Sequence, residues 1–181
     1  MMKIGVIAMT LFSLLSAGWF THLFDATPTP PHQVPIELSK AGSIAIMDVR
    51  IEQDGSYELC LSFLVENDRN GNCPIGTQCG YINNFLSNTD QWRDENVDTD
   101  GTKLPVNVKI YKVINGGKQF VCQSSYITKG VYSRGIGFIR RKIITKSFDT
   151  GRYYIYIETL ENFPELENQK AFVSISRFWR K

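Results

Sequence analysis

Few residues of this sequence are of types that could perform chemistry, and the types that are missing say most about which functions to expect. The sequence holds two histidines, His22 and His32, and both precede the region in which strand patterns begin. Without histidine, the folded region lacks the usual general base, the usual zinc ligand and the usual activator of a nucleophilic Ser or Cys. The sequence therefore disfavours most hydrolase and metalloenzyme classes, and we expect no cofactor.

The four cysteines, Cys60, Cys73, Cys79 and Cys122, form an even set. In an exported domain such cysteines normally become disulfides, and three pairings are possible. Cys73 and Cys79 bracket a tight loop, whereas Cys60 and Cys122 lie within expected strands. We therefore favour the pairs Cys73 with Cys79 and Cys60 with Cys122. A zinc site built from all four is the alternative, but their spacing is too irregular for one.

Two stretches resemble the opening of a calcium loop. Asn96, Asp98 and Asp100 place oxygen side chains at the first, third and fifth positions, and glycine follows at the sixth. Residues 66–71 repeat this pattern. Both stretches lack the closing glutamate, and Asp-Gly and Asn-Gly pairs are also ordinary turn formers. We interpret both as turns, and Asn96, Asp98 and Asp100 remain weak calcium candidates.

A basic cluster is the other charged feature, and its members are Arg134, Arg140, Arg141, Lys142 and Lys146. It could dock an acidic partner or lipid head groups, with Arg134, Arg140, Arg141 and Lys142 as the contact residues. On a strand, however, Arg140 and Lys142 share one face and Arg141 lies on the other. A charged edge strand is therefore the simpler interpretation.

The overall charge argues against a nucleic-acid partner. Twenty Lys plus Arg against eighteen Asp plus Glu leave a net charge of +2, far from the strongly basic balance that neutralises phosphates. Hydrophobic residues make up 43% of the 181 positions, which is enough for one packed domain with an appendage.

The first element along the chain is an apolar segment. Residues 4–24 contain no Asp, Glu, Lys or Arg, and about 20 such residues form a helix that crosses a bilayer. Lys3 precedes the segment and Asp25 follows it, so the positive-inside tendency places the N-terminus in the cytoplasm. We expect a single-pass anchor (1–24) in the bacterial inner membrane, a proline-rich spacer (25–33) and an exported domain (34–181) in the periplasm. Cleavage near residues 16–18 would instead release the domain into the periplasm.

Beyond the spacer, apolar residues alternate with period two, which is typical of strands. Seven strands are expected, at 43–51, 57–65, 106–114, 119–124, 137–148, 153–160 and 171–178. Turn residues at 53–55 and 115–117 predict two hairpins, and a short helix is expected over 81–92. The pattern predicts a mainly β protein, an antiparallel two-sheet β-sandwich of about seven strands.

Five segments of this region carry a further resemblance: 34–42, 57–63, 104–110, 148–153 and 163–166. They resemble a bacterial family that is catalogued only as a domain of unknown function. Its members are small Gram-negative envelope proteins, many with lipoprotein signals, so the resemblance implies an envelope location and a β-sandwich. It implies no catalytic residues. The chain departs from the family in its anchor, which has no lipidation cysteine, and in its cysteine-containing insert between Asn67 and Gly80.

We therefore expect a membrane-tethered, non-enzymatic module that binds another envelope protein, and an inhibitor or immunity-type protein is one specific form. The first alternative is a carboxylate-dependent hydrolase of cell-wall glycan. The second is a calcium-dependent binding domain. Aromatic side chains could line a sugar or peptide groove, although in strands such residues more often form the core and cross-strand pairs. Those named for the groove are Tyr153, Tyr154, Tyr156, Phe172, Phe178 and Trp179.

Overall fold

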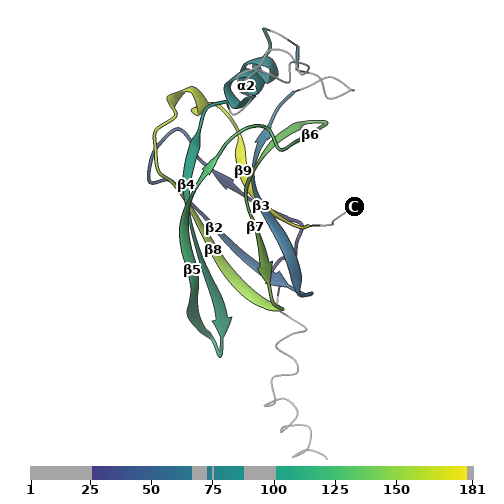
Figure 1. Cartoon of the computed structure of the whole chain (residues 1–181), viewed down its shortest axis with the longest axis vertical. Helices are drawn as coiled ribbons and strands as arrows, with labels where there is room; N and C mark the ends of the chain where they lie inside the picture. Colours follow the sequence, from purple (N-terminus) through teal and green to yellow (C-terminus); the bar gives the residue numbers. More distant parts are fainter. Residues whose placement is uncertain (1–25, 67–72, 75, 88–100, 179–181) are drawn as a thin grey trace, which may run out of the picture.

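The strands form two antiparallel sheets (Figure 1). A computed structural model describes residues 26–66, 73–74, 76–87 and 101–178. The five-stranded sheet has the order β1-β9-β3-β7-β6, and the four-stranded sheet has the order β2-β8-β4-β5. The strands are β1 (His32–Ile36), β2 (Ile44–Ile51), β3 (Gly55–Leu64), β4 (Leu104–Ile114), β5 (Gly117–Thr128), β6 (Ser133–Gly135), β7 (Phe138–Phe148), β8 (Gly151–Thr159) and β9 (Ala171–Arg177). A helix, α2 (Gln78–Ser87), and a 3-10 turn, η1 (Pro164–Leu166), complete the described elements.

The core lies between the sheets because most strands turn every second side chain inward. In β3 the inward residues are Tyr57, Leu59, Leu61 and Phe63, and all four are buried. The period-two alternation that predicts a strand over residues 57–65 therefore corresponds to one buried face. The two-sheet arrangement agrees with the β-sandwich that the alternation predicts.

All seven expected strands are present, and the described residues contain two more, β1 and β6. β1 pairs with β9 through Val34 and Val173, so the last two residues of the expected spacer belong to a strand. Pro35 interrupts the strand signal, because proline cannot donate to a ladder. An edge strand tolerates it, and β1 is an edge strand. β6 has three residues, too few to show a period.

One predicted hairpin is confirmed and the other is wrong. β4 and β5 pair up to Ile114 and Gly117, and both residues of the turn, Asn115 and Gly116, have positive φ, as a type I′ turn requires. By contrast, β2 pairs with β8, and β3 pairs with β7 and β9. Residues 52–54 therefore carry the chain from one sheet to the other. β2 and β3 each have one apolar face. These faces are buried when the two strands lie in opposite sheets, just as they would be in a hairpin, so the alternation does not distinguish the two arrangements.

α2 starts at Gln78, three residues before the predicted helix, and residues 88–92 of that prediction lie outside the described part of the chain. Thr77 caps its N-terminus, because its Oγ1 accepts a hydrogen bond from the Gly80 amide at 3.1 Å. The helix lies at one end of the two sheets (Figure 1).

The chain enters the described domain at the opposite end (Figure 1). There the Arg50 amide donates to the Pro28 carbonyl at 2.8 Å, beside the connection between β2 and β3. Among the described residues, no helix is both long and apolar enough to cross a membrane. Residues 4–24, where the anchor is expected, lie outside the described part.

Candidate binding face

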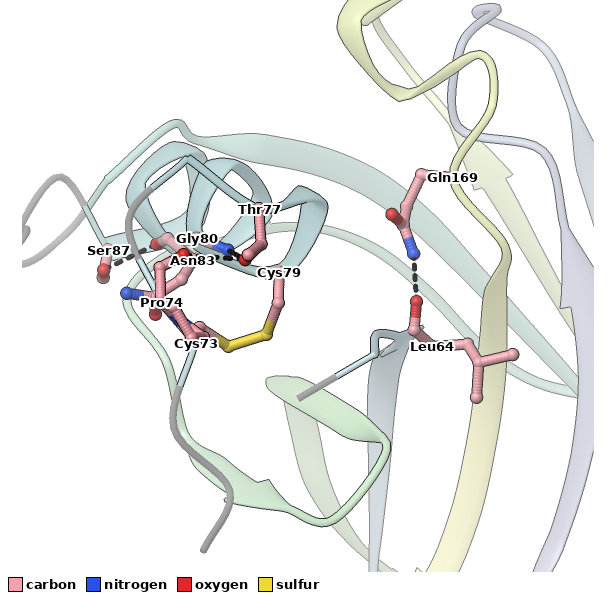
Figure 2. The surroundings of a disulfide bond; sticks show 9 residues. All are labelled: Leu64, Cys73, Pro74, Thr77, Cys79, Gly80, Asn83, Ser87 and Gln169. Atoms are coloured by element: carbon pink, nitrogen blue, oxygen red, sulfur yellow. Dashed lines mark hydrogen bonds between the residues drawn. A yellow bond between two sulfur atoms is a disulfide. The ribbon is translucent and has the colours of Figure 1, made fainter. Parts of the chain in front are cut away.

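The structure confirms one predicted disulfide and contradicts the other. Cys73 and Cys79 are bonded, with their Cα atoms 4.9 Å apart, and the bond fastens residues 73–74 to the first turn of α2 (Figure 2). Cys60 and Cys122 are not bonded. Cys60 is in β3 and Cys122 in β5, which belong to different sheets.

Cys60 cannot reach the other sheet because it alternates with the inward residues Leu59 and Leu61 and so points away from the core. Cross-strand neighbours bury it on that outer face, where it pairs with Lys142 and Ser174. Burial, followed by the nearby Glu58 carboxylate, raises the pKa of the Cys60 thiol to about 11. A thiol with such a pKa stays protonated and unreactive at neutral pH.

Neither of the two candidate metal sites, for zinc or for calcium, is seen among the described residues. In the part of the chain that the structure covers, no group of three or more His, Cys, Asp or Glu side chains could hold a metal ion. The calcium candidates Asn96, Asp98 and Asp100 lie outside that part. Calcium binding therefore stays a prediction.

The basic cluster does not form one docking patch. Arg140 and Lys142 lie on the outer face of the five-stranded sheet, where Arg140 stacks 4.4 Å from the Phe138 ring. Arg134 pairs with the inward-facing Ile139 and therefore lies on the other side of the sheet. Burial lowers the pKa of the Arg134 guanidinium to about 10. Arg141 is fully buried. The predicted split of charge between two faces is confirmed, and it removes Arg134 and Arg141 from the predicted patch.

The outer face of the four-stranded sheet brings together the side chains best suited to binding. Its cross-strand neighbours include Tyr156 with Lys109 and Tyr154 with Tyr111. A groove of about 410 Å³ lies on this face and is lined by Ile44, Asn107, Lys109, Tyr111, Lys118, Tyr156 and Glu158. We define the tyrosine–lysine face as these seven residues together with Ile46, Phe120 and Tyr154.

The aromatic rings of this face form a connected set. The Tyr111 ring meets the Phe120 ring at 5.9 Å and the Tyr156 ring at 5.7 Å, both edge to face. Lys118 Nζ lies 4.0 Å from the centre of the Tyr154 ring and donates a 2.7 Å hydrogen bond to the Tyr156 hydroxyl. This hydrogen bond is the main cause that raises the pKa of Lys118, so the ammonium stays charged.

Large apolar side chains are unusually exposed here. Ile44, Ile46 and Phe120 are 59%, 53% and 57% exposed. The outer face of an antiparallel sheet is normally polar, and a gathering of exposed apolar side chains marks an interaction site.

The clear pKa shifts among the carboxyl groups of the described chain are all downward. Arg152 donates to both carboxylate oxygens of Asp48, at 2.8 and 2.5 Å, and holds the pKa of that carboxyl below its ordinary value. The other clear carboxyl shifts, at Glu37 and Asp54, are also downward, with hydrogen bonds from Ser39 and Thr150 as the largest causes. The general acid of a glycoside hydrolase needs the opposite shift.

The aromatic residues predicted to line a groove do not share one surface. Tyr154 and Tyr156 lie on the tyrosine–lysine face, whereas Tyr153 is buried in the core. Phe172 belongs to β9, in the other sheet, and Trp179 lies outside the described part of the chain.

Of this face, the predicted groove included only Tyr154 and Tyr156, and Lys109 and Tyr111 are among the residues that sequence reasoning missed. The alternation in residues 106–114 would have placed both on one outward face. The alternation does not show which strand lies beside residues 106–114, and that neighbouring strand completes the groove.

The comparisons with known proteins agree with the fold and assign no activity. A family model described as a domain of unknown function (DUF5625) matches residues 33–177. A crystal structure of a protein from Sulfurospirillum deleyianum has a TM-score of 0.68 and 29% sequence identity, and the alignment covers 82% of this chain and 98% of that chain. No curated protein matches the sequence.

Proposed function

We propose that this chain, which belongs to the DUF5625 family, is a membrane-tethered, non-enzymatic module that binds another protein. The observation that carries the proposal is the tyrosine–lysine face. Tyrosine and other aromatic residues are enriched at protein interfaces and at the few positions that supply most of the binding energy. Here such rings surround a groove and lie beside exposed isoleucines.

The tether gives the proposal its location. The apolar segment 4–24 is expected to anchor the chain in the bacterial inner membrane, with the domain in the periplasm. The described domain begins at the end opposite α2, and the tip of the β4–β5 hairpin points towards the same end (Figure 1). An inhibitor or immunity-type protein that neutralises an enzyme of the envelope is the specific form that we propose.

Site-specific photo-crosslinking in native membranes tests the proposal. A photoreactive amino acid replaces Phe120 or Ile46 in the full chain, and both positions are exposed on the tyrosine–lysine face. The matched control replaces Thr145, which is exposed on the outer face of the five-stranded sheet. We expect Phe120 and Ile46 to crosslink one and the same protein, and Thr145 to leave it unlabelled.

A second variant shows whether the contact depends on the aromatic groove. Tyr111→Ala, introduced together with the crosslinker at Ile46, should abolish that crosslink while the chain keeps its normal abundance in the membrane. Equal labelling from all three positions, or labelling that survives Tyr111→Ala, would count against this face as the binding surface.

A further inference from the structure

The charges on the tyrosine–lysine face are not balanced within the described chain. Both oxygens of the Asp48 carboxylate accept hydrogen bonds from Arg152, so this acid is already paired. Glu158 accepts a 3.5 Å hydrogen bond from the Asn107 amide, and both side chains line the groove. Lys109 and Lys118 line the same groove, and among the described residues neither forms an ion pair.

Aromatic rings, rather than carboxylates, hold the two lysines in place. Lys109 Nζ lies 5.3 Å from the centre of the Tyr111 ring. Lys118 Nζ lies over the rings of Tyr154 and Tyr156 and donates one hydrogen bond to the Tyr156 hydroxyl. An ammonium has three N–H donors, so two donors of Lys118 remain available to a ligand. The groove thus presents cations whose positions are set before any ligand arrives.

Apolar side chains share this face with the two cations. Ile44 lines the groove, and Ile46 is the cross-strand neighbour of Tyr156. A ligand that covers the groove would therefore remove water from Lys109 and Lys118. Because a desolvated cation without a partner is costly, such a ligand must bring a negative group to them.

We infer that the partner inserts an acidic side chain, flanked by apolar side chains, into the groove, where its carboxylate pairs with Lys109 and Lys118. This inference rests on the proposed function and names the chemistry of the partner segment. Charge complementarity selects the occupant, because the groove holds two unpaired cations against the single carboxylate of Glu158. The flanking apolar side chains pack on Ile44, Ile46 and the tyrosine rings.

A pair of synthetic peptides tests the carboxylate directly. The acidic probe is acetyl-Gly-Phe-Glu-Phe-Glu-Phe-Gly-amide, and the neutral probe replaces both glutamates by glutamine. Each is titrated into the full chain in detergent micelles, with the ring signals of ¹³C-labelled tyrosine as the NMR readout. We expect the acidic peptide to bind about tenfold more tightly, which matches two partly exposed charge pairs, and we expect high salt to shrink the difference.

Three variants identify the cations that cause the preference. Lys109→Gln combined with Lys118→Gln should make the two peptides bind equally, and Lys118→Arg should keep the preference because it keeps the charge. The matched control is Lys142→Gln, since Lys142 Nζ also lies over a tyrosine ring, 4.6 Å from Tyr132, but on the other sheet. That control should leave the preference unchanged. Thermal unfolding of each variant confirms that it is folded.

The failures of the two proposals are distinguishable. Equal affinity of the native chain for the two peptides, or no saturable binding of the acidic peptide at millimolar concentration, would overturn the carboxylate inference. A preference that survives the double lysine variant would overturn it as well. None of these results bears on the outcome of photo-crosslinking from Phe120 and Ile46, which decides separately whether the face binds a protein.

Discussion

At the scale of single residues, the least expected feature is the fully buried guanidinium of Arg141. Its Nη2 donates to the Leu86 carbonyl, and its Nη1 donates to the carbonyls of Thr102 and Thr128. These acceptors come from the last turn of α2, the residues before β4 and the end of β5. A buried charge is tolerated only when such partners replace water. Arg141 therefore ties three separate segments together.

Replacing Arg141 by methionine should lower the free energy of unfolding by about 3 kcal/mol, because the buried carbonyls of Leu86 and Thr128 lose their donor. The matched control is Arg140→Met on the exposed face of the same strand, with an expected loss below about 1 kcal/mol. Urea unfolding followed by circular dichroism measures both. Similar losses in the two variants would show that the carbonyl contacts of Arg141 contribute little.

A tyrosine gives the second prediction at this scale. The Tyr132 hydroxyl donates to Glu58 Oε1 at 2.7 Å, and this hydrogen bond is the main cause that raises the pKa of Tyr132 from 10.0 to about 12. The folded state thus holds the proton more tightly than the unfolded state. The resulting stabilisation is complete below pH 10 and is lost as the pH rises towards 12.

The free energy of unfolding, measured against pH for the native chain and for Tyr132→Phe, checks this. The two curves should run parallel at neutral pH and converge between pH 10 and 12. An absorbance titration should show one tyrosine fewer ionising in that range in the variant. Parallel curves up to pH 12 would refute the raised pKa.

At the scale of elements, the junction between α2 and β4 depends on a glycine. Gly101 has a φ of 57°, and a Cβ at this position would overlap the backbone of Leu86 and Ser87. The amide of the next residue, Thr102, donates to the Phe85 carbonyl at 3.0 Å, which keeps the junction close to the helix. Only glycine allows this approach.

Gly101→Ala should therefore open the end of α2. Gly42→Ala is a suitable control, because Gly42 also has a positive φ of 79°, but no atom lies within 4 Å of the place that its new Cβ would take. The control should cost about 1 kcal/mol from backbone strain alone. Gly101→Ala should cost more and should also speed amide hydrogen exchange in Gln78–Ser87. Equal costs, with unchanged exchange in α2, would contradict the packing argument.

Elements with a strong local signal could be predicted from the sequence, and elements set by distant partners could not. The hairpin at Asn115 and Gly116 follows from residues that favour positive φ. The predicted hairpin between β2 and β3 fails because local alternation does not reveal which strand lies alongside. The same limit explains Cys60 and Cys122, since alternation places both in strands but does not reveal to which sheet each strand belongs.

At the scale of the whole molecule, sheet order creates the tyrosine–lysine face. β8 lies between β2 and β4, so residues more than a hundred positions apart in sequence become cross-strand neighbours, as Ile46 and Tyr156 do. A single sequence carries no record of that order. A mainly β fold of two antiparallel sheets could be predicted from alternation, whereas the groove depends on contacts that exist only after the four-stranded sheet has formed.

The tether and the sandwich should also be separable, which gives the last prediction. A chain that starts at residue 26 lacks the expected anchor but keeps Pro28, whose carbonyl accepts a hydrogen bond from the Arg50 amide in β2. We expect the full chain to stay with membranes during alkaline extraction. The shortened chain should be soluble and should unfold at the same temperature as the full chain.

A chain that starts at residue 38 is the matched control, because it also loses β1 (His32–Ile36) and leaves the edge of β9 unpaired. Its unfolding temperature should fall by several degrees. Extraction of the full chain at alkaline pH would contradict the anchor. Equal unfolding temperatures for the chains starting at 26 and 38 would show that β1, although paired with β9, does not stabilise the sandwich.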